Sequence, residues 1–201
     1  MPEPQKELLI EVEEYLKSGI HIGTKFKNKY MQDFIYKVRP DGLSIMNLET
    51  IDERLRIMID FLSRYAPEEI LVVSRRENSH RAVKLMSKLT GIRAIAGRYP
   101  PGTLTNPALS TFTEAKVVFV TDPWPDKNAV IDAYKVGIPI VALCDTNNTP
   151  LMIDLVVPCN NKGKKSLALI FYLFTKNYML KRGMLQKESD FKYSVEDFLE
   201  K

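Results

Sequence analysis

The stretch that decides the fold is ILVVSRRENSHRAVKLMSKLTGIRAIA, residues 70–96. It opens with apolar residues over positions 70–74, a run that is typical of a buried strand. Residues 78–90 then place apolar side chains at helical spacing and stop before Gly91, a residue type that commonly ends helices. Residues 92–96 are apolar again. This order predicts a strand, a helix and a second strand, the unit from which parallel sheets are built.

The same alternation continues along the chain. Further strands are expected at 117–120, 139–143 and 155–157, and further helices at 127–136 and 164–182. Apolar strands that alternate with helices indicate a parallel sheet covered on both faces. We therefore predict an α/β fold with about five mostly parallel strands.

The N-terminal part carries different signals. Residues 3–17 have a helical apolar stripe that Gly19 ends, so an N-terminal helix is expected within 1–18. Residues 21–33 look like an extended basic loop. We expect one domain over 1–183, followed by a tail, 184–201, in which a helical turn at 194–199 would pack against a partner.

A hairpin and a helix are expected next. Pro40-Asp41-Gly42 separates two strand-like runs, which predicts a hairpin over residues 34–48. Thr50 and Glu53 have the spacing of a capping box, which predicts a helix from there to about Tyr65.

Composition excludes some classes of protein. The formal net charge is +4, which alone is weak support for a nucleic-acid partner. No apolar run approaches the roughly 18–20 residues of a membrane span, and the start of the chain lacks a signal-peptide pattern, so we expect a cytoplasmic protein. Cys144 and Cys159 form no C-x-x-C pair, which predicts buried free thiols and no zinc.

A stiff loop reads GRYPPGTLTN, residues 97–106. Its two prolines exclude a helix or a central strand. We expect Tyr99 and Leu104 to anchor this loop to the core, at the edge where open α/β sheets bind ligands. Arg98 is its credible phosphate contact.

An enzyme remains an alternative. The dinucleotide and P-loop glycine motifs are missing. Asp122 and Asp126 follow a strand and would suit a magnesium- or phosphate-dependent enzyme, but we favour Asp122 ordering a turn and Asp126 capping the next helix. Trp124 would stack on a base or pack on its own domain, and we favour packing. His21 has no visible catalytic partner.

Basic residues gather in clusters at expected strand ends. We predict that seven of them contact RNA: Lys25, Lys27, Lys29, Arg98, Lys162, Lys164 and Lys165. The last two open a helix, where lysines oppose the helix dipole but suit a phosphate.

Four motifs in order resemble the universal S2 family of small-subunit ribosomal proteins: SGIHIG at 18–23, GRYPPGTLTN at 97–106, IPIVALCDT at 138–146 and PCNNKGKKS at 158–166. The absence of a long helical-hairpin insertion resembles the archaeal form. The resemblance implies a flavodoxin-like, Rossmann-like three-layer α/β/α domain without catalysis or cofactor. It implies small-subunit rRNA and neighbouring ribosomal proteins as partners, rather than DNA, a membrane or a small-molecule substrate. Asp132 stands where the family commonly has Glu.

Overall fold

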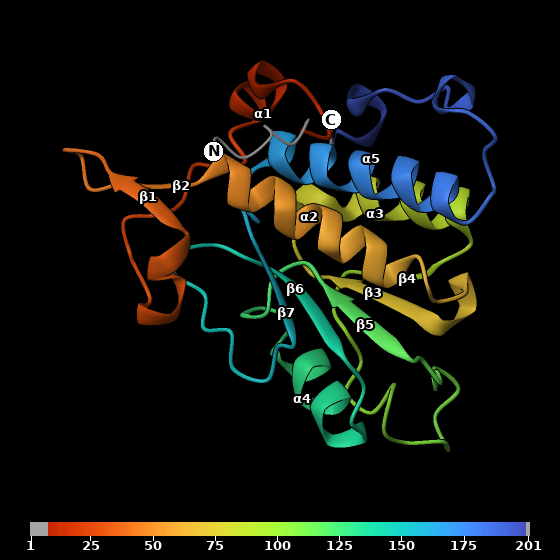
Figure 1. The fold of residues 1–201 in the computed structure, drawn as a ribbon. Helices are drawn as coiled ribbons and strands as arrows, with labels where there is room; N and C mark the ends of the chain where they lie inside the picture. Colours follow the sequence, from red (N-terminus) through yellow and green to blue (C-terminus); the bar gives the residue numbers. More distant parts are fainter. Residues whose placement is uncertain (1–7, 200–201) are drawn as a thin grey trace, which may run out of the picture.

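A five-stranded parallel sheet forms the centre of the molecule (Figure 1). The computed structural model describes residues 8–199. The strands lie in the order β4-β3-β5-β6-β7. Their bounds are β3 Ile70–Ser74, β4 Arg93–Ala96, β5 Val117–Val120, β6 Ile140–Cys144 and β7 Leu155–Pro158. The predicted α/β class and the five parallel strands are confirmed.

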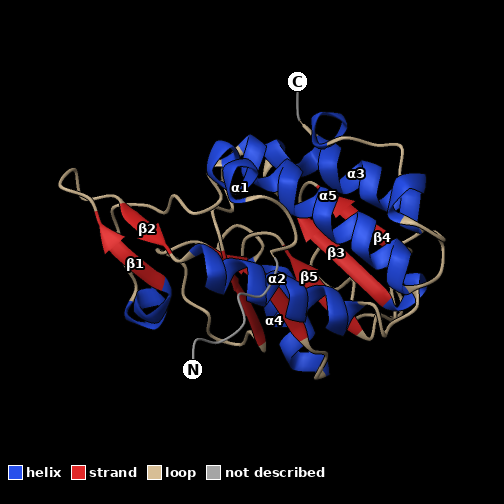
Figure 2. Ribbon diagram, turned by 45° about the horizontal axis from the view of Figure 1, so that its top comes forward, coloured by secondary structure: helices blue, strands red, loops and turns tan. Residues whose placement is uncertain are grey.

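Both faces of this sheet are buried. Alternate residues along a strand point to opposite faces, so Val72 packs with one apolar cluster and Val73 with the other. The first face carries α2 Leu48–Leu62, α3 Glu77–Thr90 and α5 Lys164–Lys181. The second face carries α4 Lys127–Val136 (Figures 1 and 2). The result is the three-layer α/β/α arrangement.

Loop 97–116 covers part of the second face. The chain passes from β3 to β4 and from β5 to β6 through a helix, but from β4 to β5 through turns alone. Tyr99 and Leu104 are buried and pack with Met31, Ala129 and other residues of the second cluster. The predicted anchoring of the loop by these two side chains is confirmed.

A small lobe, residues 22–46, stands beside the sheet and is called the N-terminal lobe below. It contains the 3₁₀ helix η1 Lys29–Phe34 and the antiparallel hairpin of β1 Ile35–Val38 and β2 Ser44–Met46. Figure 1 shows the hairpin projecting from the left of the view. The predicted hairpin is confirmed, but the prediction of an extended loop over 21–33 is wrong for the last residues of that range. There Asn28 Oδ1 accepts from Tyr30 N at 3.2 Å and Met31 is buried, which favours the helical turn.

Two predicted helix starts are wrong. Helix α1 spans Val12–Ser18 rather than beginning near residue 3; positions 3–7 lie outside the described residues. Asp52 Oδ1 accepts hydrogen bonds from the Leu9 N–H and the Tyr15 hydroxyl, at 2.9 and 2.7 Å, and ties the preceding chain to α2. Helix α2 begins at Leu48, because Asn47 caps it by accepting from Glu49 N at 3.0 Å.

The tail packs against its own chain. It forms the short 3₁₀ helices η3 Glu188–Asp190 and η4 Val195–Phe198. Phe198 is fully buried and its ring meets Tyr172 of α5 edge-on. Arg81 Nε donates to the Asp197 carbonyl oxygen at 2.9 Å. The expected helical turn therefore forms, and it lies on α3 and α5 of its own chain.

Phe198→Ala tests this docking. Removing a buried ring leaves a cavity, so the free energy of unfolding in urea should fall by about 3 kcal/mol. Met184→Ala, at an exposed position of the same tail, should change it by less than about 0.5 kcal/mol. Equal small effects of both substitutions would mean that the tail adds little to the stability of the domain.

Candidate nucleic-acid interface

The positive charge of the chain is concentrated in residues 24–39. This segment holds five Lys or Arg residues and one acidic residue, Asp33, for a net charge of +4. The whole chain has 29 basic and 25 acidic residues, also +4. The remaining residues therefore balance at 24 of each sign. A polyanion would be attracted to the N-terminal lobe before any other part of the molecule.

The lobe is fixed to the carboxyl edge of the sheet through Thr146, which follows β6. Thr146 Oγ1 accepts from the Thr24 N–H at 3.0 Å and donates to the Phe26 carbonyl oxygen at 3.1 Å. Asn28 N donates to the Thr146 carbonyl oxygen at 2.8 Å. A Cβ placed on Gly23 would lie 2.6 Å from Thr146 Cγ2, so only glycine allows this close approach.

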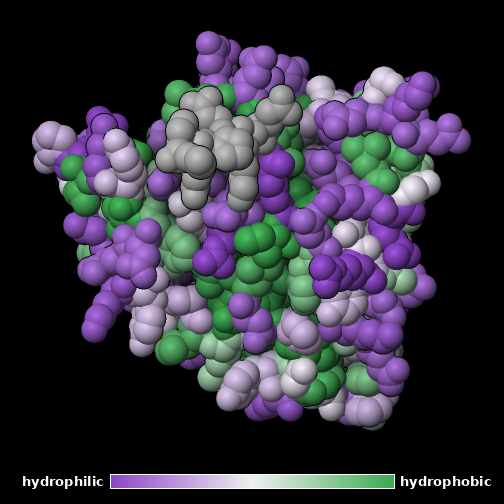
Figure 3. All heavy atoms as spheres, viewed as in Figure 1, coloured by the Kyte–Doolittle hydropathy of each residue, from purple (hydrophilic) through white to green (hydrophobic). Residues whose placement is uncertain are grey.

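Three lysines near the start of the lobe are solvent-exposed. Lys25, Lys27 and Lys29 stand free at the surface on this pinned segment. The stem of Lys25 lies against the hairpin turn, with carbons 3.9 Å from a Cβ built on Gly42. Figure 3 shows the lobe, at the left of the view, presenting mainly hydrophilic residues with some hydrophobic ones among them.

A second cluster of basic residues follows β7, near the point where the lobe joins the sheet. Asn160 N donates to the Ile20 carbonyl oxygen at 2.8 Å, which joins the loop after β7 to the start of the lobe. Lys164 and Lys165 are exposed in the first turn of α5, which has no acidic residue. The structure thus places these two predicted contacts at the carboxyl edge of the sheet, to which the lobe is also fixed.

Lys162 differs from the other predicted contacts. Its Nζ donates to Asp145 Oδ2 at 2.7 Å and to Asn147 Oδ1 at 2.8 Å. The carboxyl group of Asp145 is almost fully buried, so this bridge holds the loops after β6 and β7 together. Much of the charge of Lys162 is already neutralised within the chain.

Arg98 lies at the other end of the carboxyl edge, because β4 and β7 are the outermost strands. The Arg98 side chain is exposed. The loop behind it is held by Asp132 of α4, whose Oδ2 accepts from the Gly102 N–H at 2.8 Å and the Tyr99 hydroxyl at 3.2 Å. Burial is the main reason that the pKa of the Tyr99 phenol lies well above its usual range, and the negative charge of Asp132 raises it further. Asp132 therefore orders this loop.

The proposed metal ligands are already engaged or poorly suited. Asp122 is buried, and its Oδ2 accepts a hydrogen bond from Arg76 Nε at 2.7 Å. Nη2 of the same arginine lies 2.5 Å from this oxygen. Its Oδ1 accepts from Trp124 N and Asn148 Nδ2, both at 3.0 Å. The predicted turn-ordering role of Asp122 is thus confirmed. Within residues 8–199, no three His, Cys, Asp or Glu side chains form a group that would hold a metal ion.

Asp126 does not act as predicted. Its backbone carbonyl accepts from the first turn of α4, but its carboxyl group makes no cap there. Instead Oδ2 accepts from Arg75 N at 3.1 Å, while Oδ1 is buried without a hydrogen-bond partner. Burial raises the pKa of this carboxyl to about 7, opposed by the Arg75 hydrogen bond. A half-protonated, enclosed carboxyl group is a poor magnesium ligand.

Other reactive side chains show no catalytic grouping. Burial lowers the pKa of His21, and its Nδ1 is buried without a hydrogen-bond partner. Cys144 and Cys159 are buried free thiols, as predicted, and burial raises the pKa of both. Neither thiol would supply a thiolate near neutral pH.

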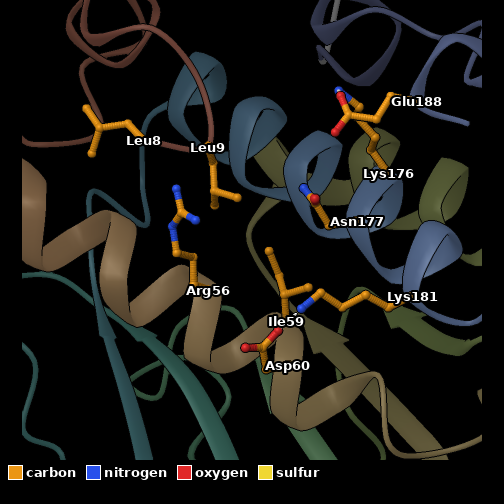
Figure 4. Close-up of a pocket in the computed structure, with 9 residues that line it drawn as sticks. All are labelled: Leu8, Leu9, Arg56, Ile59, Asp60, Lys176, Asn177, Lys181 and Glu188. Atoms are coloured by element: carbon orange, nitrogen blue, oxygen red, sulfur yellow. Dashed lines mark hydrogen bonds and ion pairs between the residues drawn. The ribbon is translucent and has the colours of Figure 1, made fainter. Parts of the chain in front are cut away.

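A cavity of about 360 Å³ lies between α2 and α5, and its lining is drawn in Figure 4. Lys181 pairs with Asp60 across it, and Lys176 Nζ lies 2.7 Å from Glu188 Oε2. Leu8, Leu9 and Ile59 supply apolar walls. The charged groups pair with one another, so this cavity presents no free acid, base or nucleophile for chemistry.

Sequence reasoning missed the exposed aromatic residues. Phe26 is 80% exposed, Tyr36 70% and Tyr30 57%. Trp124 is also 70% exposed, so the favoured prediction that it packs on its own domain is wrong. Pro123 and Pro125 flank it in a turn that Asp122 orders by accepting a hydrogen bond from its backbone N–H. The alternation of lysine and aromatic residues in KFKNKY, 25–30, was the available signal for the lobe.

These features define a class of protein: a three-layer α/β domain with a basic N-terminal lobe and no assembled catalytic group among the residues described. Comparison with known proteins gives the family. Residues 15–114 and 110–179 match Ribosomal protein S2, and the chain belongs to that family, as its motifs indicated.

Archaeal relatives match over almost their entire length. Each of the following is called small ribosomal subunit protein uS2. The protein of Nanoarchaeum equitans is 49% identical over 190 residues, 94% of both chains. That of Picrophilus torridus is 46% identical over 96% of this chain and 97% of its own, and that of Pyrobaculum islandicum is 47% identical over 98% and 96%.

Gly23→Ala tests the contact that pins the lobe. The added Cβ would clash with Thr146, so we expect the free energy of unfolding to fall by about 1–3 kcal/mol. Adding Thr146→Ser removes the methyl group and keeps the hydroxyl, so it should restore part of the loss. No rescue in a urea titration of the double variant would show that the strain lies elsewhere.

Asp126→Asn tests the buried carboxyl group. Because its folded-state pKa of about 7 exceeds the unfolded value near 4, the folded state keeps a proton that the unfolded state releases. The stability of the wild type should therefore decrease as the pH rises from about 4 to about 7, and this contribution should stay constant above that. The variant lacks the effect.

The measurement is urea unfolding between pH 4 and 8. The difference in unfolding free energy, variant minus wild type, should grow by a few kcal/mol up to about pH 7 and then level off. Glu14→Gln, at an exposed position, should show no such growth. A constant difference for Asp126→Asn would contradict the raised pKa.

Proposed function

We propose that this protein is a structural, non-catalytic constituent of the small ribosomal subunit that works in the cytoplasm. It binds small-subunit rRNA and neighbouring ribosomal proteins, and so supports subunit assembly and translation. The observation that carries this proposal is the concentration of net charge in the rigid N-terminal lobe. Membership of the ribosomal protein S2 family gives the context.

We infer that the RNA contacts are made by cations at the carboxyl edge. The set is Lys25, Lys27, Lys29, Arg98, Lys162, Lys164 and Lys165. Within this set Lys162 should contribute least, since Asp145 already pairs with it. Phosphate contacts of this kind depend on charge and shape and are weakened by salt.

The rest of the surface suits contacts with proteins. Outside residues 24–39, basic and acidic residues balance. Val12 and Leu16 leave nearly half of their surface exposed on α1, where an apolar contact with a neighbour would bury them. No helix formed by residues 8–199 has the length and apolar character needed to cross a membrane.

The alternative of a magnesium- or phosphate-dependent enzyme has no support. Asp122 is occupied by Arg76 and Asn148, and Asp126 faces the Arg75 backbone. Family membership also argues against catalysis.

A triple variant, Lys25→Ala with Lys27→Ala and Lys29→Ala, tests the proposal. Each lost phosphate contact removes about one released counterion, so the slope of log affinity against log salt should become shallower by about 2–3. The measurement is co-sedimentation with small subunits lacking this protein, at several salt concentrations.

A control removes the same charge elsewhere. Lys84, Lys88 and Lys135 are exposed on α3 and α4, and replacing all three with Ala should leave the slope within about one unit of the wild type. Equal effects of the two triple variants would assign the binding to overall charge rather than to the lobe. Failure of the wild type to bind subunits would refute the function itself.

A further inference from the structure

Three large aromatic side chains project from the N-terminal lobe without a packing role. Phe26, Tyr30 and Tyr36 are more than half exposed, while Met31 of the same lobe is fully buried in the second core cluster. The lobe therefore buries the apolar group that it needs for its own fold. Exposing aromatic rings to water is unfavourable unless a partner covers them.

The backbone that carries these rings is held in place. The Phe26 carbonyl oxygen accepts from the hydroxyls of Thr24 and Thr146, at 3.0 and 3.1 Å. Asn28 Nδ2 donates to Thr149 Oγ1 at 2.6 Å, and Asn28 Oδ1 accepts from Tyr30 N. Tyr36 lies in β1 at a β-bulge, and its neighbours Ile35 and Lys37 both pair with β2. A partner would thus meet ring positions that are largely fixed before binding, which lowers the entropy lost on association.

Cations are interleaved with the rings. Lys25, Lys27 and Lys29 alternate with other residues around Phe26 and Tyr30. Lys37 Nζ lies 6.0 Å from the centre of the Tyr36 ring. Rings that stack on bases, set between cations that meet phosphates, are the two elements of surfaces that bind single-stranded nucleic acid. A protein partner would need an acidic apolar face to match the same charge.

We propose that residues 24–39 bind unpaired RNA nucleotides, with Phe26, Tyr30 and Tyr36 stacking on bases and the adjacent lysines contacting phosphates. This inference rests on the proposed function and narrows it to one kind of RNA. In a duplex the base faces are covered by their neighbours, and the A-form helix offers mainly phosphates and 2′-hydroxyls. Only splayed bases, as in loops, bulges or single strands, expose faces to these rings.

The test uses the full chain and a fluorescein-labelled 12-nucleotide RNA of mixed sequence, either single-stranded or annealed to its complement. Fluorescence anisotropy gives the two affinities. The wild type should prefer the single strand. Phe26→Ala, Tyr30→Ala and Tyr36→Ala should each weaken single-strand binding about tenfold and leave duplex binding within about twofold.

Variants that keep the ring supply the matched control. Phe26→Tyr and Tyr36→Phe retain the stacking face and should bind the single strand as the wild type does. Tyr134→Ala removes a comparably exposed ring from α4 and should have no effect. Thermal unfolding of each variant establishes that the fold is kept.

Three outcomes would overturn the inference: equal affinity of the wild type for the two RNAs, no loss in the alanine variants, or equal loss for both RNAs. Alanine variants that bind RNA normally but fail to enter small subunits would assign the rings to a protein neighbour. If the wild type still co-sediments with small subunits in any of these cases, the proposed function stands and only the assignment of unpaired RNA fails.

Discussion

Burial of the parallel sheet on both faces is the constraint on which the rest of the structure depends. Val72 and Val73, neighbours in β3, face different apolar clusters, so each face needs its own cover. Helices α2, α3 and α5 cover one face, and α4 with loop 97–116 covers the other. With the strands fixed in this way, every loop that follows a strand emerges at one edge. That edge is where the polar network and the cations predicted to contact RNA are found.

The lobe adds to this edge a surface that the sheet alone would not provide. Thr146, which follows β6, bonds to residues on the lobe, and Gly23 permits the close approach. Through this contact a segment with the whole net charge of the chain becomes a rigid extension of the domain. Separating the charged lobe from the apolar core avoids burying unpaired cations, whose desolvation would be costly. Binding and folding therefore make separate demands on separate residues.

Strands were predicted to within about two residues, as were the starts of α3, α4 and α5, whereas the starts of α1 and α2 were less accurate. A short run of apolar β-branched residues indicates a buried segment, and in a sheet covered on both faces such a segment forms a strand. Helix starts depend on which of several nearby polar residues caps the helix, and Asn47 does so in place of Thr50. For α1, the deciding group is Asp52, a carboxylate on another helix that bonds to Leu9 and Tyr15. Sequence spacing does not contain that interaction.

The sequence by itself determined the α/β class, the parallel strands, the family and the positions of the basic clusters, because apolar periodicity and charge are properties of local segments. The tertiary structure alone decided which charged and aromatic groups are free. Lys162 pairs with Asp145, 17 residues earlier, and Arg76 with Asp122, 46 residues later. Phe26 and Trp124 proved to be exposed. Pairing and exposure depend on residues that folding brings together from distant parts of the chain, and no local pattern records them.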